Sequence, residues 1–172
     1  MLVLVVLVGA NTPPGQILIA RLAPRLTGGV VTIEGLSGRF PDRLNAARLS
    51  LHDNKGIWAT VDDLDLDWYP LQLVSGDIVI HRIAATKIAV LRSPESSGSS
   101  SGLRFAIDIE ALHVGRLNIA PAIIGTAASL ALDGSGAITP AKLGHIVLAA
   151  KGVDAPGTYH LDARLGAADL DL

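Results

Sequence analysis

The stretch that decides the fold is Leu64-Asp65-Leu66-Asp67-Trp68-Tyr69-Pro70-Leu71. Apolar residues at positions 64, 66 and 68 alternate with aspartates at 63, 65 and 67. Successive side chains of a strand point to opposite faces, so one face is apolar and the other acidic. Such alternation is typical of a half-buried strand in an antiparallel or open sheet. We expect the three aspartates to face solvent, because a one-residue slip would place them in the apolar layer.

The same period of two recurs along the chain and predicts a mostly β protein with a sheet of at least eight strands. In the run from 103 to 119 the phase slips at Ala111 and Gly115 interrupts the pattern. Strands are expected over residues 30–34, 44–52, 57–68, 76–83, 86–92, 103–114, 129–132, 146–150, 159–165 and 169–172, with Leu117 and Ile119 following the break at Gly115. Residues 120–128 are expected to form a loop or a short helix.

One longer helix is predicted over residues 13–26. Thr12 is a suitable N-cap, Pro13 suits the first helical position, and Gly28-Gly29 favours termination. Arg21 and Arg25 lie beside an aliphatic stripe. The helix therefore suits either a membrane interface or a position packed on the sheet.

Residues 2–8 form an uncharged apolar run. As a helix this run would span only ~10 Å, about a third of a bilayer core. We expect it to be the tail of a membrane anchor, with a buried N-terminal strand as the alternative. The expected organisation is a partial anchor and amphipathic helix (1–26), a first β segment (27–94), a Ser/Gly linker (95–102) and a second β segment, truncated at its C-terminus (103–172).

Composition separates the candidate classes of function. Of 172 residues 49% are hydrophobic but only 3% aromatic, so the apolar mass is aliphatic. This favours a sheet whose apolar face lines a groove over a β-sandwich with a closed core, which remains the alternative. The 14 Lys and Arg against 16 Asp and Glu argue against nucleic-acid binding. The lack of cysteine excludes disulfides and thiolate zinc sites.

No motif predicts catalysis, a metal site or a cofactor. Gly98-Ser99-Ser100-Ser101-Gly102 has the letters of a nucleophile elbow but lies in the linker rather than between a strand and a helix. The aspartates from Asp62 lack the glycine and glutamate of a calcium loop. The histidines, expected at surface or strand-edge positions, are His52, His81, His113, His145 and His160.

The residues expected to line an apolar groove are those on the apolar face of the first β segment. They are Leu49, Leu51, Leu64, Leu66, Trp68, Ile78, Ile80, Ile88 and Val90. Such a groove suits phospholipid acyl chains, which gain ~0.8 kcal/mol for each methylene removed from water.

Several phrases, in their order and spacing, resemble the N-terminal region of the TamB family. Proteins of this family are inner-membrane subunits of the translocation and assembly module of Gram-negative bacteria and belong to the AsmA-like bridge-type lipid transporters. The phrases are Asn11-Thr12-Pro13-Pro14-Gly15, Gly35-Leu36-Ser37-Gly38-Arg39-Phe40-Pro41, Gly56-Ile57-Trp58, Leu66-Asp67-Trp68-Tyr69-Pro70-Leu71 and Leu91-Arg92-Ser93-Pro94.

The resemblance implies a single-pass inner-membrane anchor and a long periplasmic sheet folded lengthwise into an apolar trough, a β-taco. It implies roles in phospholipid transport and in outer-membrane protein assembly. The family's C-terminal domain, which meets the outer-membrane partner, is not present in this chain. The alternative is a periplasmic scaffold or chaperone that pairs its strand edges with outer-membrane protein strands by β-augmentation.

Overall fold

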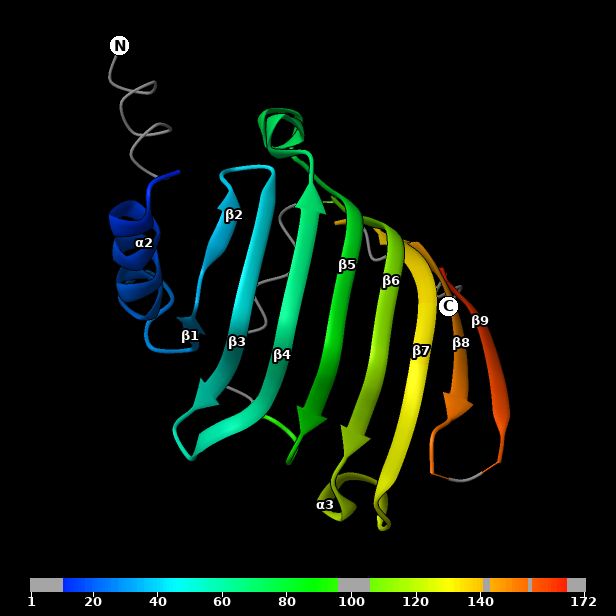
Figure 1. The fold of residues 1–172 in the computed structure, drawn as a ribbon. Coiled ribbons are helices and arrows are strands. Elements are labelled where there is room, and N and C mark those ends of the chain that lie inside the picture. The colour runs from blue at the N-terminus through cyan, green and yellow to red at the C-terminus, as the bar shows by residue number, and fades with distance from the viewer. Residues whose placement is uncertain (1–10, 96–105, 141–142, 155, 167–172) are drawn as a thin grey trace, which may run out of the picture.

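A computed structural model of the chain describes residues 11–95, 106–140, 143–154 and 156–166. Over these residues the protein is mostly β, with one N-terminal helix and a single curved, unclosed sheet of nine strands (Figure 1). The predicted mostly β class and strand number are therefore confirmed. The apolar run at residues 2–8, most of the Ser/Gly linker, the elbow-like motif and the expected strand at 169–172 lie outside the described residues.

The strands follow one another across the sheet almost in chain order. Neighbouring strands are antiparallel except β5 and β6, which are parallel. β1 and β2 share the same partner, β3. The elements are α2 (Pro13–Leu26), β1 (Val31–Glu34), β2 (Ser37–Arg39), β3 (Arg43–Asp53), β4 (Gly56–Trp68), the 3-10 turn η1 (Pro70–Ser75), β5 (Asp77–Val90), β6 (Ala106–Ile119), α3 (Pro121–Ile124), β7 (Ala128–Ile138), β8 (Gly144–Gly152) and β9 (Thr158–Leu165).

Helix α2 has the predicted bounds and cap. The Thr12 hydroxyl accepts a hydrogen bond from the Gly15 N–H at 3.3 Å. The helix lies beside β1 at the edge of the sheet (Figure 1), where Gln16 donates to the Gly38 carbonyl at 3.0 Å. Ile17 and Leu18 remain more than half exposed. No helix among the described residues is long and apolar enough to cross a membrane.

Two strand predictions were wrong in the same way. The expected strands 76–83 and 86–92 are one strand, β5, and Gly115 does not end the strand that contains it, because β6 runs to Ile119. At each of these positions two adjacent residues face solvent, so the alternation of the strand changes phase. In the sequence this pattern resembles the end of a strand, but in the sheet it is a local irregularity within one strand. Residues 120–128 were expected to form a loop or a short helix. They contain a short helix, α3, which confirms the second alternative.

One of these phase changes is aligned across four strands. Ala47, Asp63, Thr86 and Gly115 are skipped in the pairing of β3, β4, β5 and β6, while the pairs on both sides keep the same register. Asp63 has a positive φ of 52°. A Cβ at Gly115 would lie 3.0 Å from the Thr86 carbonyl oxygen, so the backbones approach closely here. We call this line of four residues the crease.

A second phase change lies in β5 and β6, and the register of β5 with β4 and of β6 with β7 shifts at this level. Ile80 pairs with Ile109 and Ile83 with Leu112, so both strands carry two residues between the pairs. The His81 Nδ1 lies 2.7 Å from the Glu110 Oε2 across this irregularity. The slip predicted at Ala111 is therefore present, and its partner slip on β5 was missed.

A carboxylate holds the β3–β4 turn to the segment that follows β5. Asp53 accepts two hydrogen bonds from Arg92, at 2.6 and 2.5 Å, and one from the Glu95 N–H at 2.9 Å. The Asp53 side chain is only 12% exposed. The Arg92 guanidinium and then the Glu95 N–H hold the pKa of Asp53 well below its ordinary value of 3.8.

Because the folded-state pKa of Asp53 is depressed, its contribution to stability is present above about pH 4 and is lost as the pH falls further. We expect Asp53→Asn to lower the melting temperature by a few degrees at neutral pH. The gap between variant and parent should shrink steadily below about pH 4, as followed by circular dichroism. A gap independent of pH would contradict this role.

The crease gives a second prediction. Asp63→Gly should preserve or raise stability, because glycine adopts positive φ without cost. Asp63→Val should lower the free energy of unfolding by about 1–2 kcal/mol, because a β-branched residue is strained there. Urea unfolding measures both, and equal stability of the two variants would show that the crease does not need its left-handed residue.

Candidate functional site

The structure brings the predicted groove residues onto one face of the sheet. Leu49 and Ile88 lie in one cross-strand row through Val61, and Leu51 and Val90 lie in another through Ala59. The remaining candidates lie on the other side of the crease. Trp68 and Ile80 share one cross-strand row, and Leu64, Leu66 and Ile78 each lie in a row of their own. All nine candidates are half-buried. We call this surface the apolar face.

The apolar face is larger than the sequence predicted. On β5 it also includes Ile83 and Ala85, which stand at the opposite parity from Ile80 and Ile88. It continues across β6 to β8, where rows pair Leu66, Ile83 and Leu112, or Leu64, Ala85 and Val114. The residues that extend it in the second half are Ile107, Ile109, Leu112, Val114, Leu117, Ile119, Leu130, Leu132, Ile138, Ile146 and Leu148. Consecutive polar residues such as His81-Arg82 could have indicated, from the sequence, that the apolar positions of the strand change from even to odd numbers.

Little of this face is covered. Only Ala46, Ala59, Ala85 and Val114 are fully buried among the described hydrophobic residues, and three of these side chains are small. The main contacts between described elements join neighbouring strands, α2 to β1, and β5 to η1. Within the described part of the chain, no second layer packs on the apolar face, in agreement with the single layer in Figure 1.

The apolar face contains a hollow of about 170 Å³ over β6, β7 and β8. Its floor includes Gly136, which stands between Ile109 and Ile146 in one cross-strand row. A row further on, a Cβ at Gly134 would lie 2.4 Å from the Val147 carbonyl oxygen, so only glycine fits there. The absence of a side chain at Gly136 leaves room for the hollow between Ile109 and Ile146.

The opposite face carries charge. Arg48 pairs with Asp62 at 2.7 Å and Arg43 with Asp67 at 2.9 Å. Asp63 and Asp65 are exposed, as predicted, whereas Asp67 is half-buried beneath its arginine.

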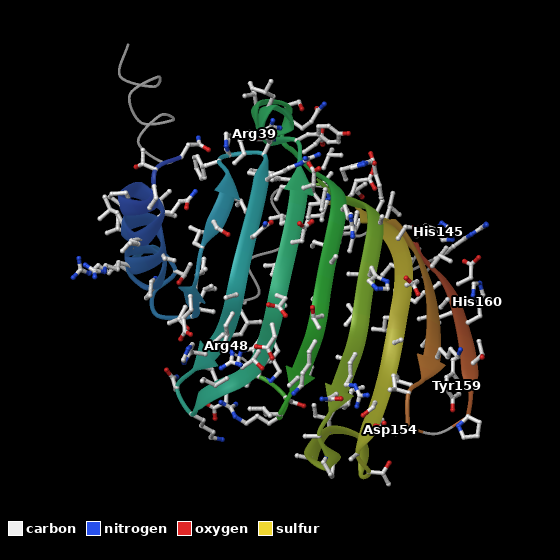
Figure 2. All side chains as sticks on the ribbon, in the orientation of Figure 1. Arg39, Arg48, His145, Asp154, Tyr159 and His160 are labelled. Atoms are coloured by element: carbon white, nitrogen blue, oxygen red, sulfur yellow. The ribbon has the colours of Figure 1, made fainter. Side chains whose placement is uncertain are left out.

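Histidines continue this charged face in the second half of the sheet (Figure 2). His113 lies 2.7 Å from Asp133, and His145 lies 2.8 Å from Asp162, whose pKa the imidazole lowers. His81, His113, His145 and His160 are exposed, as predicted, and His52 is half-buried. Their carboxylate partners were not predicted from the sequence. No group of three potential metal ligands occurs among the residues described.

The two faces define the chemistry available to this protein: an open aliphatic surface on one side and hydrated ion pairs on the other. No protein-family model, no curated protein and no solved structure matches the chain. The resemblance to the TamB family therefore stands on the sequence phrases alone.

The hollow can be tested by filling it. We expect Gly136→Val to reduce binding of a lipophilic dye severalfold, because a side chain there occupies the space between Ile109 and Ile146. Its Cβ would lie 3.3 Å from its nearest neighbours, so small shifts accommodate it. Ala149→Val, on the exposed opposite face, is the matched control and should leave dye fluorescence unchanged. Equal dye binding by parent and Gly136→Val would rule out the hollow as the binding place.

Proposed function

We propose that the apolar face binds phospholipid acyl chains, and that the chain is part of an inner-membrane-anchored periplasmic protein. Such a protein would support phospholipid transport to, and protein assembly in, the outer membrane. The observation that carries the proposal is the continuous aliphatic face, half-buried along its length and without a covering layer among the described residues.

Acyl chains suit this face for a physical reason. Each methylene that leaves water contributes ~0.8 kcal/mol without any directional contact. A surface of Leu, Ile, Val and Ala offers such burial at every row and holds no chain at one fixed position. Lipid can therefore move along the rows while remaining shielded, and no catalytic group or cofactor is required.

The resemblance to the TamB family supports the finer form of the proposal. In that form the curved sheet is a segment of a trough folded lengthwise, a β-taco, with the inner membrane at its N-terminal side. The outer-membrane assembly partner would be reached through a further C-terminal domain. The crease supports this shape, because aligned irregularities bend all four strands along one line.

One observation favours a second candidate function. β9 pairs with β8 alone in the described part of the sheet, so its other backbone edge is available there. An unfolded outer-membrane strand could add to this edge by β-augmentation. This scaffold function uses backbone groups, whereas lipid binding uses the apolar side chains.

Substitution on the apolar face separates the two functions. A photoreactive residue near Leu66 should crosslink to acyl chains in the parent, and Leu66→Asp or Ile80→Asp should reduce the crosslinks at least tenfold, because a carboxylate in an apolar layer repels acyl chains. Crosslinking is read by mass spectrometry and folding by circular dichroism.

Asp65→Asn is the matched control, because Asp65 is the strand neighbour of Leu66 on the opposite, exposed face. It should crosslink like the parent. Undiminished crosslinking in folded Leu66→Asp would refute lipid binding by the apolar face and leave the scaffold function as the better candidate.

A further inference from the structure

The turn between β4 and β5 exposes apolar side chains that the sheet does not use. Leu71 is 84% exposed and Val74 is 90% exposed, and Tyr69 is 47% exposed. Pro70–Ser75 contains no charged residue. In Figure 1 this 3-10 turn stands out from one end of the sheet. We call Tyr69, Leu71 and Val74 the knuckle.

Nothing in the described fold explains this exposure. η1 makes its main contacts with β5, and the high exposure of Leu71 and Val74 shows that neither is needed to pack the sheet. Large aliphatic side chains this exposed and adjacent to one another are typical of a surface that meets an apolar partner.

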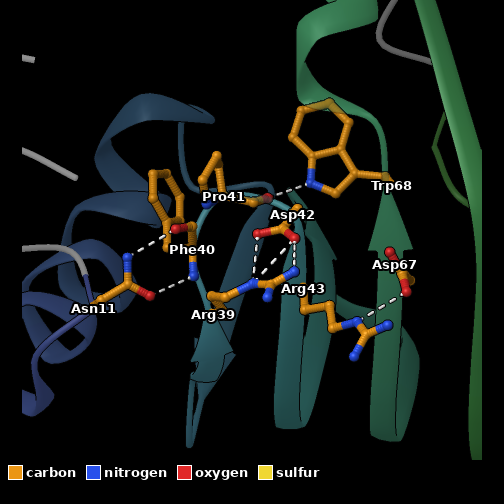
Figure 3. Close-up of polar contacts among 8 residues, drawn as sticks. All are labelled: Asn11, Arg39, Phe40, Pro41, Asp42, Arg43, Asp67 and Trp68. Atoms are coloured by element: carbon orange, nitrogen blue, oxygen red, sulfur yellow. Dashed lines mark hydrogen bonds and ion pairs between the residues drawn. The ribbon is translucent and has the colours of Figure 1, made fainter. Parts of the chain in front are cut away.

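The first described residues are fixed at the same end of the sheet. The Asn11 amide donates to the Phe40 carbonyl and accepts from the Phe40 N–H, both at 2.8 Å (Figure 3). The Trp68 indole, one residue before the knuckle begins, donates to the Pro41 carbonyl at 2.5 Å. Asn11 and Trp68, the residue before the knuckle, are therefore bonded to adjacent residues, Phe40 and Pro41, of the turn between β2 and β3.

This arrangement identifies the partner. The uncharged apolar run Leu2-Val3-Leu4-Val5-Val6-Leu7-Val8 lies a few residues before Asn11 in the sequence. The segment that carries this run therefore joins the described structure at Asn11, at the end of the sheet where the knuckle lies. A lipid bilayer can accept both this run and the knuckle at once, because its surface is extended and apolar below the headgroups.

Charge near the knuckle is consistent with a mainly apolar contact. Arg39 is held by Asp42 and Arg43 by Asp67 (Figure 3). Each guanidinium is already paired with a carboxylate, so neither is available as an unpaired cation to attract anionic lipid. Tyr69, whose ring centroid is 6.0 Å from that of His81, places an aromatic residue at the boundary, where aromatic side chains favour the headgroup region.

We propose that the knuckle inserts into the surface of a bilayer and holds this end of the sheet against the membrane. The contact is additional to any anchor formed by the N-terminal residues. It goes beyond the proposed lipid binding by the apolar face, since it uses different residues at the end of the sheet.

The chain has no cysteine, so single labels report on single positions. Val74→Cys in the full chain, labelled with an environment-sensitive fluorophore, should shift its emission to the blue on addition of phosphatidylethanolamine–phosphatidylglycerol vesicles. Lipids with a spin label on the acyl chain should quench it. Ile124→Cys is the matched control, because Ile124 is also exposed but lies in α3 at the opposite end of the sheet.

Binding is then tested by flotation with the same vesicles. Leu71→Asp with Val74→Asp should reduce the vesicle-bound fraction about tenfold, since two aliphatic side chains no longer enter the bilayer. Ile124→Asp should bind like the parent. Leu66→Asp should also bind, so that failure of the apolar-face proposal and failure of this one are distinguished.

Three outcomes would overturn the proposal. The label at position 74 could remain in water while the chain floats with vesicles, or the labels at 74 and 124 could respond equally. A blue shift at position 74 that grows with protein concentration and needs no vesicles would instead show that the knuckle meets a second copy of the chain.

Discussion

The crease is the constraint on which the rest of the structure depends. A strand alternates its side chains strictly, so a segment such as Ala46-Ala47-Arg48-Leu49 would normally place Ala46 and Leu49 on opposite faces. Skipping one residue at the same level in β3, β4, β5 and β6 returns both to the same face. A slip in a single strand would disrupt pairing on both sides. Four slips at one level keep the pairs on both sides of the crease in register from β3 to β6, whereas the register of β6 with β7 shifts there.

The same constraint separates charge from the apolar face. At the crease Arg48, Asp62, Lys87 and Arg116 form one cross-strand row, in which Asp62 stands between two cations and Lys87 is next to Arg116. They stay hydrated only because the phase changes beside them. Exposed ion pairs contribute little to stability one by one. Their effect here is on register, because a slip would carry this row into the aliphatic layer, where unpaired charge is costly.

Sequence periodicity predicted the parts of the fold in which the helical or strand period runs without interruption. The helix with its Thr12 cap, the mostly β class and the aspartate-lined β4 follow from local rules. It failed at the phase changes, where β5 was divided in two and Ile83 and Ala85 were left out of the apolar face. Local sequence cannot distinguish a strand end from an irregularity, because the difference is whether the neighbouring strand slips at the same level. That is a property of the pairing.

The face that results differs from a closed core in what it can hold. Aromatic side chains would fill the concavity and pack against one another, but aliphatic rows interrupted by Gly134 and Gly136 leave the surface open and locally hollow. Only four described hydrophobic residues are buried, so much of the apolar area of the sheet is left uncovered by the described residues. The proposed partner is long, apolar and without a fixed register, which suits rows that repeat with nearly equal chemistry. Acyl chains have those properties, whereas a folded domain would need matching side chains at defined positions.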